Sequence, residues 1–258
     1  MLRRISHFFL PVAICFSLIA VATAEEPVPN KFNALEFKGK DDGVLKYQFF
    51  VPKKSKSKEK SPLLIFLHGA GERGDNNTSQ LKHGRSAMKK FGEDTNGYVI
   101  APQCPRETTW CLTSWKAKEH RMPEVSKPMA LLKQVIDQTM KDYPIDPNRV
   151  YVMGLSMGGF GTFDAIQRYP EIFAAAVPIC GGGDVEGAKT MKDIPIWAFH
   201  GDKDTAINVS RSRDMVAALK KVGGSIKYTE YPGKGHGIWN TVFADQEMWK
   251  WLIAQKKK

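Results

Sequence analysis

A serine flanked by glycines lies at residues 154–159, G-L-S-M-G-G, directly after the apolar run Val150 to Met153 and directly before a helical pattern that begins at Phe160. Small residues on both sides of Ser156 allow a sharp strand-to-helix turn, which exposes the hydroxyl above a sheet. A serine hydroxyl is a poor nucleophile at neutral pH unless a base lies within hydrogen-bond reach. The pattern therefore predicts nucleophilic chemistry at Ser156, assisted by a base and an acid.

Two histidines follow Ser156 and are the candidates for the base. In the chain order that accompanies this kind of turn, the nucleophile comes first, the acid second and the histidine last. His200 ends an apolar run, so we assign it a structural role. His236 lies in the glycine-rich stretch 233–237, after the strand-like run 225–231, where a loop can carry an imidazole to the serine. We therefore favour His236 as the base.

The acid is expected in the loop that follows His200, where Asp202 and Asp204 are both available. Its task is to accept the Nδ1–H of the histidine and to stabilise the imidazolium that forms during the reaction. Asp184 is a third carboxylate, but it lies one loop too early. The spacing by itself leaves Asp202 and Asp204 open.

Short apolar runs alternate with amphipathic patterns along the chain that must position these residues. The runs, which have the length of buried strands, occupy residues 44–51, 63–67, 98–101, 150–153, 174–179 and 194–199. Apolar residues at three- and four-residue spacing predict helices over 128–143 and 215–222. This alternation predicts an α/β fold with a mostly parallel central sheet covered by helices on both faces, and functional sites at the carboxyl ends of its strands. The Lys/Ser segment between Pro52 and Pro62 is expected to be a hairpin loop.

Four motifs in order resemble those of the α/β-hydrolase superfamily: H-G-A-G-E-R-G at 68–74, G-L-S-M-G-G at 154–159, H-G-D-K-D at 200–204 and G-H at 235–236. The resemblance is closest to its phospholipase/carboxylesterase members and its secreted feruloyl or acetylxylan esterase-like members. It implies the α/β-hydrolase fold and a serine esterase that works through an acyl-enzyme. In those relatives the second Asp of G-D-x-D is the acid, which implies Asp204 here, with Asp202 bracing the loop.

The same resemblance gives a role to the glycine-rich loop at 68–74. Hydrolysis of an ester passes through a tetrahedral oxyanion, which needs two or more preorganised donors. In the related enzymes one backbone N–H comes from this loop and another from the residue after the nucleophile. We expect the N–H groups of Ala70 and Met157 to form the oxyanion hole, and Glu72 and Arg73 to pair and hold the loop.

Three tryptophans are candidates for substrate contacts. Trp110 and Trp115 lie in the aperiodic segment 103–121, which follows a strand, and Trp239 closely follows His236. Aromatic rings can stack on a sugar or on a phenolic acyl group, although packing is their commoner role. The substrates expected are short-chain or carbohydrate-linked esters.

Residues 1–24 read as a secretory signal, with Arg3 and Arg4 before an apolar stretch and small residues before Glu25. A retained membrane anchor is the alternative. Cleavage after Ala24 leaves one domain, residues 25–258, which we expect to be secreted or periplasmic, without stable membrane insertion.

The formal charge of +11 falls to +9 after cleavage. Part of this positive charge lies in the Lys-rich run at residues 53–60, which contains no aromatic residue that could stack on a base. We therefore interpret the run as a solvated loop and expect no nucleic-acid partner.

Three cysteines remain in the predicted mature chain. The spacing of Cys104 and Cys111 leaves a disulfide open, and Cys180 is expected to be a small buried residue. No cluster has zinc spacing and no dinucleotide-binding fingerprint is present, so neither a metal nor a cofactor is predicted. With 42% hydrophobic and 25% charged residues, the composition excludes disordered, fibrous and polytopic membrane proteins.

Two other functions fit part of the pattern. A prolyl oligopeptidase-like serine peptidase has a similar turn at its nucleophile, but this chain has no room for the propeller domain of those enzymes. A non-catalytic polysaccharide-binding protein on a hydrolase scaffold would use the basic surface and the tryptophans, but it would not need a complete set of serine, acid and histidine. The oligomeric state is not predicted.

Overall fold

The computed structural model describes residues 26–55, 59–117, 119–122 and 124–257. The predicted secretory signal, residues 1–24, lies outside the described residues, as does part of the Lys-rich run 53–60. Within the described ranges, no helix is both long enough and apolar enough to cross a membrane.

In the part of the chain that the structure describes, eight strands form one sheet in the order β1-β2-β4-β3-β5-β6-β7-β8. β1 and β2, and β2 and β4, pair antiparallel, whereas every pair from β4 to β8 is parallel. The sheet therefore confirms the predicted mostly parallel α/β architecture. The strands are β1 (Lys31–Lys38), β2 (Val44–Val51), β3 (Ser61–Leu67), β4 (Tyr98–Gln103), β5 (Ile145–Leu155), β6 (Ala175–Ile179), β7 (Ile196–Gly201) and β8 (Ile226–Tyr231).

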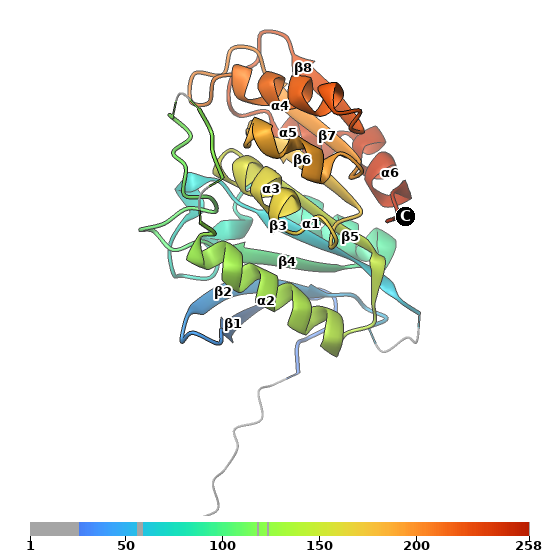
Figure 1. Cartoon of the computed structure of the whole chain (residues 1–258). Coiled ribbons are helices and arrows are strands. Elements are labelled where there is room, and N and C mark those ends of the chain that lie inside the picture. Colours follow the sequence, from blue (N-terminus) through green and yellow to red (C-terminus); the bar gives the residue numbers. More distant parts are fainter. Residues whose placement is uncertain (1–25, 56–58, 118, 123, 258) are drawn as a thin grey trace, which may run out of the picture.

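Helices cover both faces of this sheet, because side chains that alternate along each buried strand enter two separate cores. Leu63 and Ile65 of β3 pack with α2, α3 and α4, whereas Leu64 and Phe66 pack with α1, α5 and α6. α2 and α3 cross the front of the sheet in Figure 1, and α1 lies behind it. The helices are α1 (Arg85–Thr95), α2 (Lys127–Asp142), α3 (Met157–Arg168), α4 (Ser210–Lys221), α5 (Trp239–Ala244) and α6 (Gln246–Ala254), with 3₁₀ turns η1 (Ala70–Glu72), η2 (Ser79–Leu81) and η3 (Val185–Met191).

The predicted hairpin between residues 52 and 62 is wrong. β2 and β3, which this segment connects, are not neighbours, because β4 lies between them and pairs with both. The connection is therefore a crossover. Strand β1 was not expected either. It is an edge strand whose side chains are exposed or only partly buried, so its sequence lacks a strong apolar pattern.

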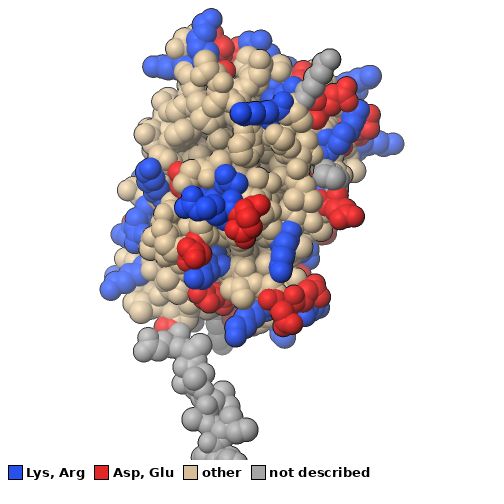
Figure 2. Space-filling view, turned by 90° about the vertical axis from the view of Figure 1, so that its left-hand side faces the viewer, with Lys and Arg blue, Asp and Glu red and all other residues tan. Residues whose placement is uncertain are grey.

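The loops that follow the carboxyl ends of the parallel strands gather at one edge of the sheet, on the left in Figure 1. Ser156, Asp204 and the 3₁₀ turn η1 all lie at this edge, after β5, β7 and β3. Figure 2 views the molecule from that side and shows acidic and basic side chains interspersed around uncharged surface. The topology thus brings the motifs of the sequence to a single edge.

Candidate active site

Ser156 lies in the sharp turn between β5 and α3, with φ 55° and ψ −119°. This positive φ is uncommon for a residue with a side chain and stores backbone strain, a feature typical of functional sites. The surroundings enforce the turn. A Cβ at Gly154 would overlap the carbonyl of Gly158, and a Cβ at Gly158 would overlap the carbonyl oxygen of Leu67. Glycine at both positions therefore lets the turn pack tightly against the end of β3.

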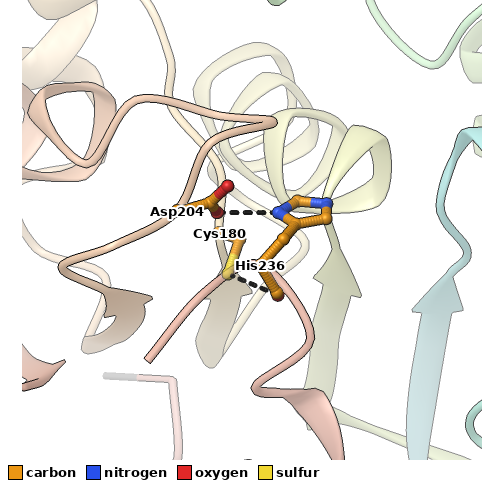
Figure 3. A group of neighbouring side chains, drawn as sticks. All are labelled: Cys180, Asp204 and His236. Carbon is orange, nitrogen blue, oxygen red and sulfur yellow. Dashed lines mark hydrogen bonds and ion pairs between the residues drawn. The ribbon is translucent and has the colours of Figure 1, made fainter. Parts of the chain in front are cut away.

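Ser156, His236 and Asp204 form a continuous chain of hydrogen bonds. The Oγ of Ser156 is 2.9 Å from the Nε2 of His236, and the Nδ1 of His236 is 2.7 Å from the Oδ2 of Asp204. Because a carboxylate only accepts, Nδ1 carries the proton, and Nε2 is left to accept the serine hydroxyl. Figure 3 shows the carboxylate of Asp204 directed at the imidazole of His236. The arrangement can activate a serine hydroxyl for attack on a carbonyl.

The carboxylate of Asp204 is fully buried and held from several sides. Oδ1 accepts hydrogen bonds from the backbone N–H groups of Ala206 and Ile207, and Oδ2 contacts His200 as well as His236. Burial alone would raise the pKa of Asp204, but the hydrogen bonds from His200, His236 and Ile207 outweigh it and hold this pKa well below its ordinary value. Asp204 is therefore ionised at neutral pH.

The structure separates the two aspartates that the spacing left open. Asp204 faces His236, whereas the Oδ1 of Asp202 accepts the backbone N–H of Gly233 at 2.7 Å. Asp202 thus braces the loop that carries His236. Asp184, the third candidate, caps η3 and accepts the N–H of Met122, away from this chain of hydrogen bonds.

The loop at 68–74, expected to form the oxyanion hole, lies against Ser156. A Cβ at Gly69 would be 3.5 Å from the Cβ of Ser156, so the start of η1 and the start of α3 are close. Among the described residues, the N–H groups of Ala70 and Met157 have no hydrogen-bond partner. Two backbone donors are thus available beside the serine hydroxyl.

His68, the first residue of the motif at 68–74, anchors this loop. Its Nδ1 donates to the carbonyl of Gly69 at 2.6 Å, and its Nε2 accepts the N–H of Cys104 at 2.9 Å. Burial lowers the pKa of His68 to about 4, so the ring is neutral and can make both bonds. His68 therefore ties the end of β3 to the end of β4.

Glu72 and Arg73 do not pair with each other, contrary to expectation. Arg73 donates to the carbonyls of Ala70 and Thr108, each at 3.1 Å. The buried carboxylate of Glu72 lies 3.2 Å from the Nε2 of His83, which belongs to none of the four sequence motifs. The two side chains still hold the loop, but through separate partners.

The three tryptophans have different environments. Trp110 is fully buried, its indole N–H donates to the carbonyl of His68, and it packs against Gly161. The prediction of a substrate contact is therefore wrong for Trp110, which is a packing residue. Trp115 is half-buried beside Phe160. Trp239 is half-buried with its ring 5.4 Å from that of His236, so it is adjacent to the candidate base.

All three described cysteines are free and buried, so the disulfide that the spacing left open is not formed. Cys104 packs in the core shared with α2 and α3, whereas Cys111 lies in a separate cluster with Phe160 and Ile207. The two thiols therefore have different surroundings despite their short separation in sequence. Cys180 is buried, as expected.

The thiol of Cys180 lies beside the contact between Asp204 and His236. Its Sγ is 3.4 Å from the carbonyl oxygen of His236. A dashed line in Figure 3 marks the contact between these two residues. One ligand atom from each of the three side chains lies within 4.8 Å of the others, a spacing that could hold a metal ion. However, a thiol binds metals as the thiolate, and burial raises the pKa of Cys180. The Nδ1 of His236 also already donates to Asp204.

Comparisons with known proteins place the chain in a family. Residues 52–249 match the model of the phospholipase/carboxylesterase family. A thermostable esterase of known structure is 38% identical, with a TM-score of 0.83 over 88% of this chain and 64% of that one. An acylaminoacyl peptidase from Pyrococcus horikoshii, 15% identical with a TM-score of 0.61, covers 81% of this chain and 38% of that one, and shares the fold alone.

Two relatives with described activities match different shares of the chain. A bifunctional acetylxylan esterase/xylanase from Neocallimastix patriciarum is 34% identical over 57% of this chain, but this match spans only 20% of that protein. A carboxylesterase from Arabidopsis thaliana is 25% identical over 72% of this chain and 88% of its own length. With its eight-stranded sheet and its family match, the chain belongs to the phospholipase/carboxylesterase family of α/β-hydrolases.

Proposed function

We propose that this protein is a serine carboxylic-ester hydrolase. The observation that carries the proposal is the chain of hydrogen bonds from Ser156 Oγ through His236 to the ionised Asp204. Family membership and the 38% identity to a thermostable esterase support it. The peptidase that resembles this chain shares the fold alone, and no observation favours peptide substrates over esters.

The reaction begins when Ser156 attacks the ester carbonyl while Nε2 of His236 takes the hydroxyl proton. The imidazolium formed is stabilised by Asp204, which stays ionised. His236 then gives the proton to the leaving alcohol as the C–O bond breaks, which leaves an acyl-enzyme on Ser156. Water attacks the acyl-enzyme, with His236 again as base, and releases the acid and the free serine.

The oxyanion that develops in both steps is assigned to the N–H groups of Ala70 and Met157. Ala70 starts the 3₁₀ turn η1 and Met157 starts the helix α3, and neither N–H has another partner among the described residues. Donors that are fixed before the reaction stabilise the developing charge without reorganisation, which lowers the barrier by about 3–4 kcal/mol per donor in comparable enzymes.

The substrate class that we propose is short-chain or carbohydrate-linked esters, and the location is outside the cytoplasm after cleavage of residues 1–24. Support for the substrate comes from the relatives, because four proteins that match 57–90% of this chain have acetylxylan esterase in their names. Trp115 and Trp239 remain the candidates for contacts to substrate. No cofactor is needed for this mechanism.

The experiment that tests the function is hydrolysis of nitrophenyl esters from acetyl to dodecanoyl, and of methyl ferulate, by the wild type and by Ser156→Ala. We expect the substitution to lower kcat by about 10⁴-fold or more with an unchanged fold, because it removes the nucleophile. Ser225→Ala, an exposed serine before β8, is the matched control and should retain full activity. Wild-type turnover in Ser156→Ala would refute the assignment.

Two further outcomes would favour the alternative functions. Cleavage of aminoacyl anilides without ester turnover would favour a serine peptidase. Failure of an organophosphonate to label Ser156 would favour a non-catalytic polysaccharide-binding protein.

A further inference from the structure

Two aromatic side chains, His83 and Trp239, connect the loop at 68–74 with His236. The carboxylate of Glu72, in this loop, lies 3.2 Å from the Nε2 of His83. The ring centroids of His83 and Trp239 are 5.2 Å apart, and those of Trp239 and His236 are 5.4 Å apart. Both separations lie in the range of about 4.5–7 Å at which aromatic rings are in contact. The four side chains therefore form a continuous path of contacts.

Both ends of this contact path lie beside Ser156. A Cβ built at Gly69 would be 3.1 Å from the Oε2 of Glu72 and 3.5 Å from the Cβ of Ser156. At the other end, the Nε2 of His236 is 2.9 Å from the Oγ of Ser156. The path thus begins at the loop expected to hold the oxyanion and ends at the base, so it borders the reaction site on one side.

The members of the path are buried to different degrees. The side chain of Glu72 is 7% exposed and that of His83 is 29% exposed. A buried carboxylate is costly unless a partner compensates its charge, so the contact with Glu72 holds His83 in place. Trp239 is half-buried and packs on the core that α1, α5 and α6 share. A ring that is already fixed loses little freedom when it contacts a ligand.

The contact with His236 relates Trp239 to the alcohol part of an ester. His236 gives its proton to the leaving alcohol, so the alcohol oxygen lies within hydrogen-bond reach of Nε2. The carbonyl oxygen, in contrast, is assigned to the N–H groups of Ala70 and Met157. A ring in contact with the imidazole therefore adjoins the alcohol. The C–H groups of a sugar ring form an apolar surface that can pack on a tryptophan.

We propose that Trp239 packs against the sugar on the alcohol side of a carbohydrate-linked ester, and that His83, held by Glu72, positions the tryptophan ring. The inference rests on the proposed function for the ester chemistry. It deepens that function, because it assigns the sugar to one side of the site and gives His83 and Glu72 a role in specificity.

The first test compares two acetate esters with different alcohols: an acetylated methyl xyloside, which carries a sugar, and ethyl acetate, which does not. The selectivity ratio is kcat/KM for the xyloside divided by kcat/KM for ethyl acetate. Trp239→Ala should lower this ratio about tenfold, mainly through KM for the xyloside, because the contact with the sugar is lost. Trp239→Phe keeps a smaller ring and should lower it about twofold. An unchanged ratio in Trp239→Ala would overturn the proposal.

Trp249→Ala is the matched control for the loss of a tryptophan. Trp249 is also half-buried and packs on the same core, but its ring contacts Phe91 of α1, with 6.1 Å between the ring centroids. The variant should lower the thermal midpoint and leave the selectivity ratio unchanged. If the ratio fell as far as in Trp239→Ala, the effect would be a general one and the sugar contact would be overturned.

A double-mutant cycle tests whether His83 acts through Trp239. His83→Ala removes the ring that meets Trp239, so it should lower the selectivity ratio about threefold in the otherwise wild-type protein. In the Trp239→Ala background it should have no further effect on the ratio, because the ring that it positions is absent. The ratio is insensitive to a disturbance of the loop at 68–74 that slows both esters equally. No change in the first background, or an equal fall in both, would overturn the positioning role.

A binding measurement separates this proposal from the ester hydrolysis itself. Unacetylated xylo-oligosaccharide is titrated calorimetrically into Ser156→Ala and into Ser156→Ala combined with Trp239→Ala. Binding that is about tenfold weaker in the double variant supports the sugar contact even if the wild type hydrolyses no ester. Equal affinities, or no measurable binding to either protein, would overturn it even if Ser156-dependent ester hydrolysis is found.

Discussion

Two histidines contact the same oxygen of Asp204, and their surroundings differ. The Nε2 of His200 lies 3.1 Å from Oδ2 and the Nδ1 of His236 lies 2.7 Å from it. The side chain of His200 is completely buried, and its Nδ1 is 2.7 Å from the Oγ of Ser212. The side chain of His236 is 24% exposed, and its Nε2 meets Ser156.

The difference shows that contact with the acid does not make a histidine a general base. Both nitrogens of His200 are engaged with groups of the fold, so it has no free position for a substrate proton. His236 has one nitrogen on the acid and the other on the serine, at a surface that substrate can reach. His200 therefore positions Asp204, and Asp204 in turn orients His236.

The largest expected effect distinguishes the two histidines by activity. His236→Ala should lower kcat for 4-nitrophenyl acetate by about 10⁴- to 10⁶-fold, because the serine loses its base. The thermal midpoint should change little, since the side chain is partly exposed. His200→Phe is the comparison variant. If His236→Ala retained more activity than His200→Phe, the two roles would have to be exchanged.

Asp204→Asn removes the charge shared by both histidines. We expect kcat to fall about 10⁴-fold, because an amide cannot stabilise the imidazolium and favours the wrong tautomer of His236. Asp202→Asn, which changes the neighbouring bracing residue, serves as the matched control. It should affect stability more than turnover. Comparable losses of kcat in the two variants would show that the acid has been wrongly assigned.

His200→Phe should act on stability first. It leaves Asp204 and Ser212 each without one hydrogen-bond partner in a buried site, so the free energy of unfolding should fall by about 1–3 kcal/mol. The carboxylate keeps its bonds to Ala206, Ile207 and His236, so kcat should fall by about tenfold or less. Urea unfolding and steady-state kinetics on the same preparation measure both. A loss of kcat without a loss of stability would contradict the positioning role.

The low pKa of Asp204 makes stability depend on pH in a defined direction. A carboxyl group with a lowered pKa in the folded state stabilises the fold above its unfolded pKa of about 3.9, and this contribution is lost as pH falls toward the folded value. Unfolding of the wild type and of Asp204→Asn should therefore differ most above pH 4 and converge in stronger acid. Subtracting the two curves cancels the contributions of His68 and His120, which both proteins share. A constant difference across the acid range would contradict this linkage.

The smallest expected effect is the slow reaction of the three described thiols, including that of Cys180, which lies beside Asp204 and His236. Because the described thiols are buried and burial raises their pKa values, a disulfide-exchange reagent should react slowly with the native protein. In denaturant, the chain without its predicted signal should release three thiols, from Cys104, Cys111 and Cys180. A count of one would show that Cys104 and Cys111 are joined after all.

The apolar runs of the parallel strands could be read directly from the sequence, because burial on both faces requires continuous hydrophobic residues. In contrast, neither the edge strand β1 nor the position of β4 between β2 and β3 could be read from the sequence. Pairing partners are chosen by packing of the whole sheet, and the segment between residues 52 and 62 carries no signal that distinguishes a hairpin from a crossover.

The sequence by itself predicted the candidate chemistry of this protein: the glycines around Ser156 allow a sharp turn, and the order of the motifs points to His236 and to Asp202 or Asp204. Only the tertiary structure decided which carboxylate meets His236, that Trp110 is buried, and that Glu72 contacts His83 and not Arg73. The reason is physical. Local backbone conformation depends on neighbouring residues, whereas burial and hydrogen-bond partners depend on loops that are distant in sequence and meet only when the sheet has formed.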